Sequence, residues 1–205
     1  VNSNIAQRLL TVDELEDLLV AARVKSLFHT LVIYFFACTG CRVSELSLAM
    51  WKDFFIGPQG EICLNIHGKG HKDRIIKINQ SLWDIIIKYR IEKSLCTEIN
   101  PNDLSPLLIN KYGKAYSSQS LWKVVKVVAK EAGLNKKPSP HWLRHTFATE
   151  AAKDPTTNLW RLQQDLGHVS LTTTQQYVHV AQDMADTSVD HLAYLDKLEN
   201  HIEGD

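Results

Sequence analysis

The sequence predicts a mainly α-helical domain with one small antiparallel β-sheet, which is an α+β fold. Apolar residues recur at helical spacing along most of the chain, beginning with Leu15, Leu18 and Leu19. Apolar and polar residues alternate instead over 62–66 and 74–78, where ICLNI and RIIKI flank the turn-forming run GKGHKD. With 205 residues and 44% hydrophobic content, the chain is large enough to bury a core without disulfides.

Start and stop signals divide the helical part into segments. Thr11 and Glu14 have the spacing of a capping box, so the first helix begins at Thr11. Gly40 separates a helix expected over 26–38 from a short one over 42–48. Further helices are expected over 82–94, 118–132, 141–152, 159–166 and 172–179. Periodic Val and Leu residues also predict a C-terminal amphipathic helix within 180–205.

Composition limits the classes of protein to which this chain can belong. Lys plus Arg and Asp plus Glu both total 23, so only a local cluster of basic residues, near 69–77, favours a polyanionic partner. The longest apolar run, 27–41, falls short of the roughly 20 residues that a membrane span needs. The first residues lack the pattern of an export signal, and the 4 cysteines are too few for a disulfide scaffold. We therefore expect a cytoplasmic protein with reduced thiols and no membrane partner.

Two motifs in the first half of the chain contain groups suited to phosphodiester chemistry. In TGCRVSEL, Arg42 follows a glycine turn and can offer its planar fork to two phosphate oxygens, while Glu45 can hold that guanidinium. In HGKGHKDR, Lys69 extends from a glycine turn and can donate a proton to a leaving oxygen. Considered singly, each motif has a commonplace alternative, a surface ion pair for the first and a solvated basic turn for the second.

Two further motifs follow in the second half. In SPHWLRHTFAT, His141 and Arg144 lie one turn apart on a helix that begins at Pro140. In LGHVSLTTTQQY, a glycine ends a helix, and Tyr177 follows His168 after nine positions. A packed core tyrosine is the commonplace alternative for Tyr177.

The set TGCRVSEL, GKGHKDR, HWLRHTFAT and LGHVSLTTTQQYVHV resembles the catalytic motifs of the tyrosine recombinases, which include phage integrases, Xer proteins and transposon resolvases of this type. The resemblance covers nearly the whole chain in the family's order. It implies the tyrosine recombinase catalytic-domain fold and site-specific DNA cleavage and rejoining through a 3′-phosphotyrosyl bond, with no metal or other cofactor. The catalytic residues that it implies are Arg42, Lys69, His141, Arg144, His168 and the nucleophile Tyr177, with Glu45 in support.

The resemblance also implies partners and domain organisation. It implies double-stranded DNA as substrate, a homotetramer on paired DNA sites, a monomer or weak oligomer without DNA, and a nucleoid location. Family members usually carry an amino-terminal DNA-clamping domain, so 1–205 is expected to be a catalytic domain without it. The segment 180–205 is expected either to dock on its own domain or to be exchanged between protomers. Contacts to the DNA backbone are expected from Lys72, Arg74, Lys77, Lys111, Lys114 and Lys123.

Other functions fit the residues less well. His141 and His145 have a spacing that zinc accepts, but no glutamate lies between them as in HExxH. Cys38 and Cys41 form a CxxC pair, yet the pair ends a helix and lacks the strand–helix setting of a thiol oxidoreductase. A non-catalytic DNA-binding module is disfavoured because all six reactive positions are filled. A type IB topoisomerase, which relaxes DNA by similar chemistry, stays open as the alternative, although the third and fourth motifs are more like those of recombinases.

Overall fold

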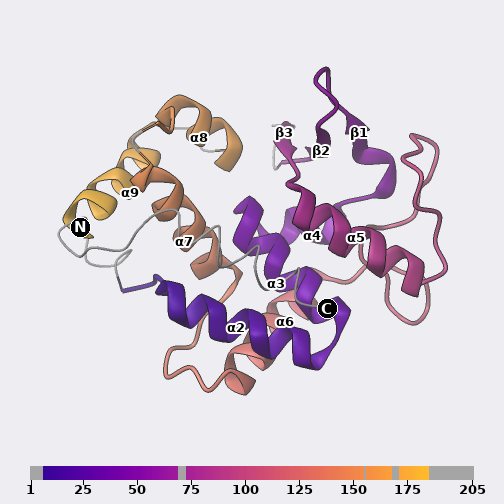
Figure 1. The fold of residues 1–205 in the computed structure, drawn as a ribbon, viewed down its shortest axis with the longest axis horizontal. Helices are drawn as coiled ribbons and strands as arrows, with labels where there is room; N and C mark the ends of the chain where they lie inside the picture. Colours follow the sequence, from indigo (N-terminus) through magenta and orange to yellow (C-terminus); the bar gives the residue numbers. More distant parts are fainter. Residues whose placement is uncertain (1–6, 69–72, 155, 168–170, 185–205) are drawn as a thin grey trace.

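The computed structural model describes residues 7–68, 73–154, 156–167 and 171–184. These residues form a mainly helical domain with one three-stranded antiparallel sheet, as the sequence predicts. In Figure 1 the helix α3 (Leu27–Thr39) lies in the middle of the molecule, and a group of three helices, α7 (Pro140–Lys153), α8 (Leu159–Leu166) and α9 (Leu171–Met184), lies to its left, with α8 beside the sheet. The remaining helical elements are α2 (Val12–Lys25), α4 (Val43–Leu48), the 3-10 turn η1 (Trp51–Asp53), α5 (Gln80–Glu92) and α6 (Ser118–Glu131).

The expected helices are present, with shifts at their ends. Thr11 caps α2 through the capping box with Glu14, and Ser26 accepts from the backbone of the first turn of α3. The segment expected over 172–179 is longer than predicted, because α9 continues to Met184. The rest of the predicted C-terminal helix, 185–205, lies outside the described residues.

The sheet has the order β1-β2-β3, with strands Phe54–Ile56, Ile62–Ile66 and Arg74–Lys77. The predicted hairpin is the β2–β3 pair, in which Ile66 faces Arg74 across the ladder. Strand β1 is absent from the sequence prediction, since three residues are too few to display alternation. Side chains alternate along β3, so Arg74 and Ile76 point inward while Ile75 and Lys77 are exposed.

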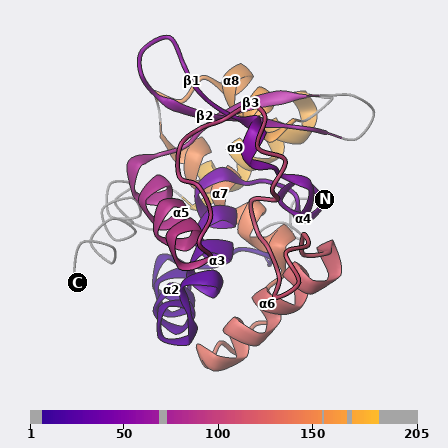
Figure 2. The same ribbon diagram turned by 90° about the vertical axis from the view of Figure 1, so that its right-hand side faces the viewer.

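The main core surrounds α3, in which every residue from 30 to 37 is buried. This helix packs against α2, α5, α6 and α7, which explains why its sequence is apolar on all sides. A smaller buried cluster lies among α7, α8 and α9 and consists of Ala148, Leu162, Leu166 and Tyr177. Figure 2 shows the sheet at one end of the molecule and α2 and α6 at the other. In the part of the chain that the structure describes, no helix combines the length and apolar character that crossing a membrane requires.

Candidate active site

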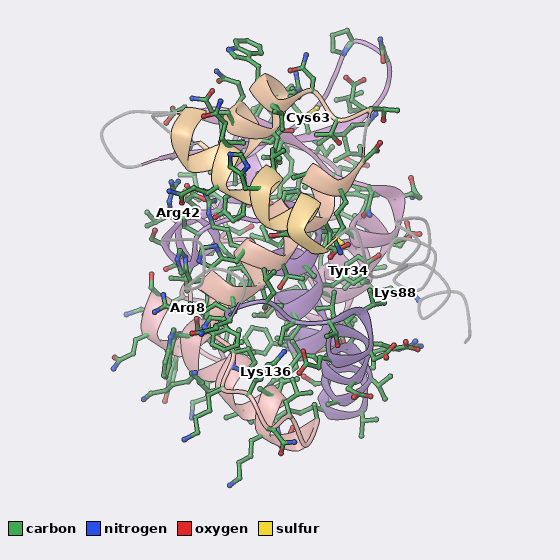
Figure 3. All side chains as sticks on the ribbon, turned by 90° about the vertical axis from the view of Figure 1, so that its left-hand side faces the viewer. Arg8, Tyr34, Arg42, Cys63, Lys88 and Lys136 are labelled. Carbon is green, nitrogen blue, oxygen red and sulfur yellow. The ribbon has the colours of Figure 1, made fainter. Side chains whose placement is uncertain are left out.

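Arg42 lies directly before α4, at the position that caps this helix. Its backbone N–H and its Nη1 both donate to the Glu45 carboxylate, at 2.7 and 2.8 Å, and its Nη2 donates to the carbonyl of Gly167 at 3.2 Å. The Arg42 side chain is 42% exposed, whereas that of Glu45 is 3% exposed. Figure 3 shows Arg42 at the edge of the molecule, on the side where Arg8 also lies. Glu45 thus forms a hydrogen-bonded ion pair with Arg42, and the guanidinium keeps one side open to solvent.

Arg144, from α7, is the second predicted phosphate clamp, and it is buried. Its Nη1 donates to the carbonyl of Gly40 at 2.6 Å, and its Nη2 donates to the carbonyl of Leu166 at 2.5 Å. Burial lowers the pKa of Arg144 to about 10, and the nearby charge of Arg42 adds to that shift. The guanidinium therefore remains protonated at neutral pH and is a fixed positive charge within the site.

Two glycines at helix ends determine where the carbonyls of Gly40 and Leu166 point. Gly40 ends α3 and Gly167 ends α8, with φ of 59° and 61°, in the left-handed region that favours glycine. A Cβ on Gly40 would lie 2.4 Å from Cδ1 of Phe147, so a side chain there would also force the Phe147 ring to shift. The helix ends that the sequence marks with glycine therefore supply acceptors for the site's arginines.

Tyr177, on α9, is only 3% exposed and belongs to the small buried cluster. Its hydroxyl forms a 2.9 Å hydrogen bond with Nδ1 of His145 on α7. Burial raises the pKa of the phenol above its usual value of 10, although the charges of Arg144 and Arg42 act against this shift. Tyr177 is consequently protonated at neutral pH, with both guanidinium groups close enough to influence its ionisation.

The two histidines of α7 have different environments. His141 is exposed, whereas His145 is 7% exposed, and their ring centroids lie 4.1 Å apart. Burial, followed by the charges of His141, Arg144 and Arg8, lowers the pKa of His145 to about 4. The His145 ring is therefore neutral at neutral pH, and an Nδ1 that accepts from the tyrosine places the proton on Nε2. The pKa of His141 is also lowered, first because the protein around one side of its ring reduces its hydration and then because of the charge of Arg144.

Arg74 has a setting that differs from the one expected from the sequence. A contact to the DNA backbone was expected, but the Arg74 side chain is 6% exposed and forms an ion pair with Glu45. Its Nη1 and Nη2 donate to the two carboxylate oxygens at 2.7 and 2.8 Å, and its Nε donates to the carbonyl of Asp165 at 2.7 Å. The alternation of RIIK, which puts Arg74 on the same face as Ile76, was the signal that could have indicated burial.

The remaining predicted site residues divide into two groups. Lys69, Lys72 and His168 lie outside the described residues. The predicted DNA-backbone lysines within the described residues are exposed, namely Lys77, Lys111, Lys114 and Lys123, and their role stays a prediction. His145 is the residue whose importance was underestimated, since no sequence pattern connects it to a tyrosine 32 positions away.

The thiol alternative does not fit this environment. Cys41 is fully buried, and burial raises the pKa of its thiol to about 11. A reactive cysteine needs the opposite shift. The Cys41 sulfur instead lies 3.9 Å from Nη2 of Arg74, as part of the packing beneath the arginines.

Comparisons with known proteins agree with the motifs. The model of the phage integrase family matches residues 8–184. Tyrosine recombinase XerD of Bifidobacterium longum is 36% identical over 183 residues, which cover 84% of this chain and 58% of that protein. Tyrosine recombinase XerC of Thermodesulfovibrio yellowstonii is 35% identical over 73% of this chain and 49% of its own length. The chain thus spans little more than half the length of these relatives.

Solved structures give the same result for the fold. The crystal structure of XerA recombinase has a TM-score of 0.69 at 25% identity and covers 94% of this chain and 62% of its own. XerH site-specific recombinase, bound to palindromic difH substrate in a post-cleavage complex, has a TM-score of 0.72 at 30% identity, with coverage of 87% and 51%. The fold expected from the motifs is confirmed, and the chain belongs to the phage integrase family of tyrosine recombinases.

Proposed function

We propose that this protein is a site-specific recombinase that cuts and rejoins DNA through a 3′-phosphotyrosyl bond on Tyr177. The observation that carries the proposal is the convergence of Arg42, Arg144 and Tyr177, from three separate segments, around the C-terminal end of α8. Two fixed guanidinium groups beside a phenol suit the transfer of a phosphoryl group to that phenol. Because the similar proteins are recombinases, we propose strand exchange rather than relaxation of supercoils.

In the proposed reaction the Tyr177 oxygen bonds to the scissile phosphorus and loses its proton, while the bond from phosphorus to the 5′-oxygen breaks. Arg42 and Arg144 neutralise the non-bridging oxygens as charge develops on them. Lys69 protonates the departing 5′-oxygen, His141 assists proton transfer, and His168 donates to a phosphate oxygen. Because the covalent intermediate retains the energy of the broken bond, a 5′-hydroxyl can reverse the step without ATP.

The described arrangement suits a resting enzyme. Proton transfer from Tyr177 to His145 would run from a phenol whose pKa burial raises above its usual value to an imidazole whose pKa is lowered to about 4, so the transfer is strongly unfavourable. A general base should have a pKa close to the working pH, so His145 is poorly matched to that task here. We infer that Tyr177 leaves this buried hydrogen bond before it attacks DNA.

We further propose double-stranded DNA as the substrate and a homotetramer on paired sites as the active assembly. The XerH neighbour is bound to palindromic difH substrate, which supports a DNA complex of the same kind. Because its substrate is DNA, we propose that the protein is cytoplasmic and associated with the nucleoid. Residues 180–205 are proposed to dock on a neighbouring protomer or on their own domain.

Capture of a covalent adduct tests the proposal. The whole protein is incubated with sheared, nicked genomic DNA from the organism that carries the gene, and adducts are isolated under denaturing conditions. We expect the wild type and Tyr112→Phe, which alters a tyrosine that is 73% exposed, to form an adduct. Tyr177→Phe should form none while its DNA affinity stays within about threefold of the wild type. An adduct with Tyr177→Phe would show that the nucleophile is wrongly assigned.

A further inference from the structure

Three arginines from three elements meet at the C-terminal end of α8. Nε of Arg74 donates to the carbonyl of Asp165, Nη2 of Arg144 to that of Leu166, and Nη2 of Arg42 to that of Gly167. Carbonyls at the end of a helix lack partners within the helix and carry partial negative charge, so they attract guanidinium groups. The last two carbonyls of α8 and the carbonyl of the capping Gly167 therefore act as a shared anchor for all three side chains.

Arg74 differs from the other two because the resemblance implies catalytic roles at the scissile phosphate for Arg42 and Arg144 but not for Arg74. Its side chain is 6% exposed, and Nε, Nη1 and Nη2 all donate to acceptors within the protein. A DNA phosphate would have to displace Glu45 or the α8 end to reach it. Lys77, three residues later on the same strand, is exposed, so β3 already presents another positive charge to solvent.

Glu45 connects Arg74 to Arg42. Its Oε1 accepts from Nη1 of both guanidiniums, at 2.7 Å from Arg74 and 2.8 Å from Arg42, while Oε2 accepts from Nη2 of Arg74 and the backbone of Arg42. Because Arg74 occupies both oxygens, only one edge of the carboxylate is left for the Arg42 side chain. The second terminal nitrogen of Arg42 is thereby kept off Glu45 and directed to the α8 end.

We propose that Arg74 is a positioning residue that holds Glu45 in a bridge and so keeps the Arg42 guanidinium aligned and positively charged toward the scissile phosphate. This inference rests on the proposed function. With Arg74 present, two guanidiniums share one carboxylate, and the group retains a net positive charge for the phosphate. Without Arg74, Glu45 is free to pair with both terminal nitrogens of Arg42, which gives a neutral ion pair. We expect such a pair to leave DNA affinity nearly unchanged but to stabilise the transition state poorly.

The test compares Arg74→Gln and Arg74→Lys with Lys88→Gln, which removes a charge from an exposed position on α5. Single-turnover cleavage is measured at saturating concentration of a nicked duplex built from the DNA that the wild type captures covalently. We expect Arg74→Gln to slow cleavage by roughly tenfold to a hundredfold, with DNA affinity within about threefold of the wild type. Arg74→Lys should also be slow, since an ammonium cannot bridge both carboxylate oxygens and the α8 carbonyl. Lys88→Gln should retain the wild-type rate.

A methylphosphonate at the scissile position separates positioning from a merely structural role. This group lacks the charge of one non-bridging oxygen, so misalignment of Arg42 matters less for its cleavage. We expect the Arg74→Gln defect to shrink to about threefold or less on this substrate. An equal defect on both substrates, or weaker DNA binding with an unchanged saturating rate, would overturn the proposal.

The double variant Glu45→Gln/Arg74→Gln covers the case in which Arg74→Gln alone folds poorly, because it removes both partners of the buried ion pair. If Arg74 acts through Glu45, the double variant should cleave no more slowly than Glu45→Gln, whereas additive losses would contradict the proposal. Cleavage by Arg74→Gln at the wild-type rate would overturn this inference and leave the proposed function intact. Failure of the wild-type protein to form any adduct would instead remove the proposed function itself.

Discussion

The main core around α3 and the small cluster around Tyr177 differ in how many contacts stabilise the site residues next to them. In the main core, α3 packs against four other helices. Gly40, at the C-terminal end of α3, accepts a hydrogen bond from Arg144, and Glu45 accepts one from Arg42. In the small cluster, Tyr177 is retained by a few apolar residues and by the hydrogen bond to His145. Each phosphate-binding arginine thus has one anchor next to the main core, at Gly40 or Glu45, and a second at the C-terminal end of α8. The nucleophile lies in the part that can open at lower cost, as a residue that must move toward DNA requires.

The largest expected effect comes from truncating the main core. Phe35→Ala should lower the free energy of unfolding by about 3–5 kcal/mol, since this ring is fully buried in the main core. Leu162→Ala, in the small cluster, should cost about 2 kcal/mol, near the lower limit for such changes, because few neighbours surround the resulting cavity. Urea unfolding curves with a common slope give both values.

Amide hydrogen exchange sharpens this comparison. In Leu162→Ala the faster exchange should be confined to α8 and α9, whereas Phe35→Ala should accelerate exchange in α2, α3 and α5 as well. Faster exchange throughout the domain in Leu162→Ala would mean that the two regions unfold as one unit, and the difference in firmness between them would then not exist.

Lowering the pH should destabilise the small cluster before the main core, and the titration of His145 should lower the free energy of unfolding by at most about 3 kcal/mol. The unfolded chain protonates His145 near its ordinary pKa of 6.5, while the folded protein keeps it neutral down to about 4. The unfolded state therefore binds more protons in this window, and stability falls as the pH drops from 6.5 to 4 at up to about 1.4 kcal/mol per unit. His145→Gln lacks this titrating group, so its stability should decline less steeply than that of the wild type, with a remaining slope from His141 and His29, whose pKa values are also lowered. A decline of equal slope in His145→Gln would assign the effect to another group.

The titration of Glu45 should affect stability at lower pH than that of His145, and next to the main core rather than in the small cluster. Its pKa is lowered from 4.5 to about 2 because the hydrogen bonds and charge of Arg74 and then Arg42 outweigh the cost of burial. Its contribution is complete above pH 4.5 and is lost as the pH falls toward 2. We therefore expect the amides of α9 to lose protection between pH 6.5 and 4, before those of α4.

The sequence predicted the elements with strong periodicity or clear caps, such as α2 with its capping box, and the motif residues on them. It did not predict β1, which is too short for a pattern, and it indicated a DNA contact for Arg74 because charge outweighed the inward register of β3. The pairs Arg144 with Leu166 and His145 with Tyr177 join separate helices. Their geometry depends on how α7, α8 and α9 pack, which local sequence does not encode.

The smallest expected effect concerns the hydrogen bond between His145 and the proposed nucleophile, Tyr177. His145→Phe removes the Nδ1 acceptor, which should destabilise the buried position of Tyr177 by about 0.5–1.5 kcal/mol, the net value of a neutral hydrogen bond. If release of Tyr177 limits the rate, single-turnover cleavage should rise about twofold to tenfold. His145→Gln keeps an acceptor and should stay near the wild-type rate. If His145 instead removes the phenolic proton during attack, both variants should cleave about a hundredfold more slowly, because neither side chain can accept a proton at neutral pH.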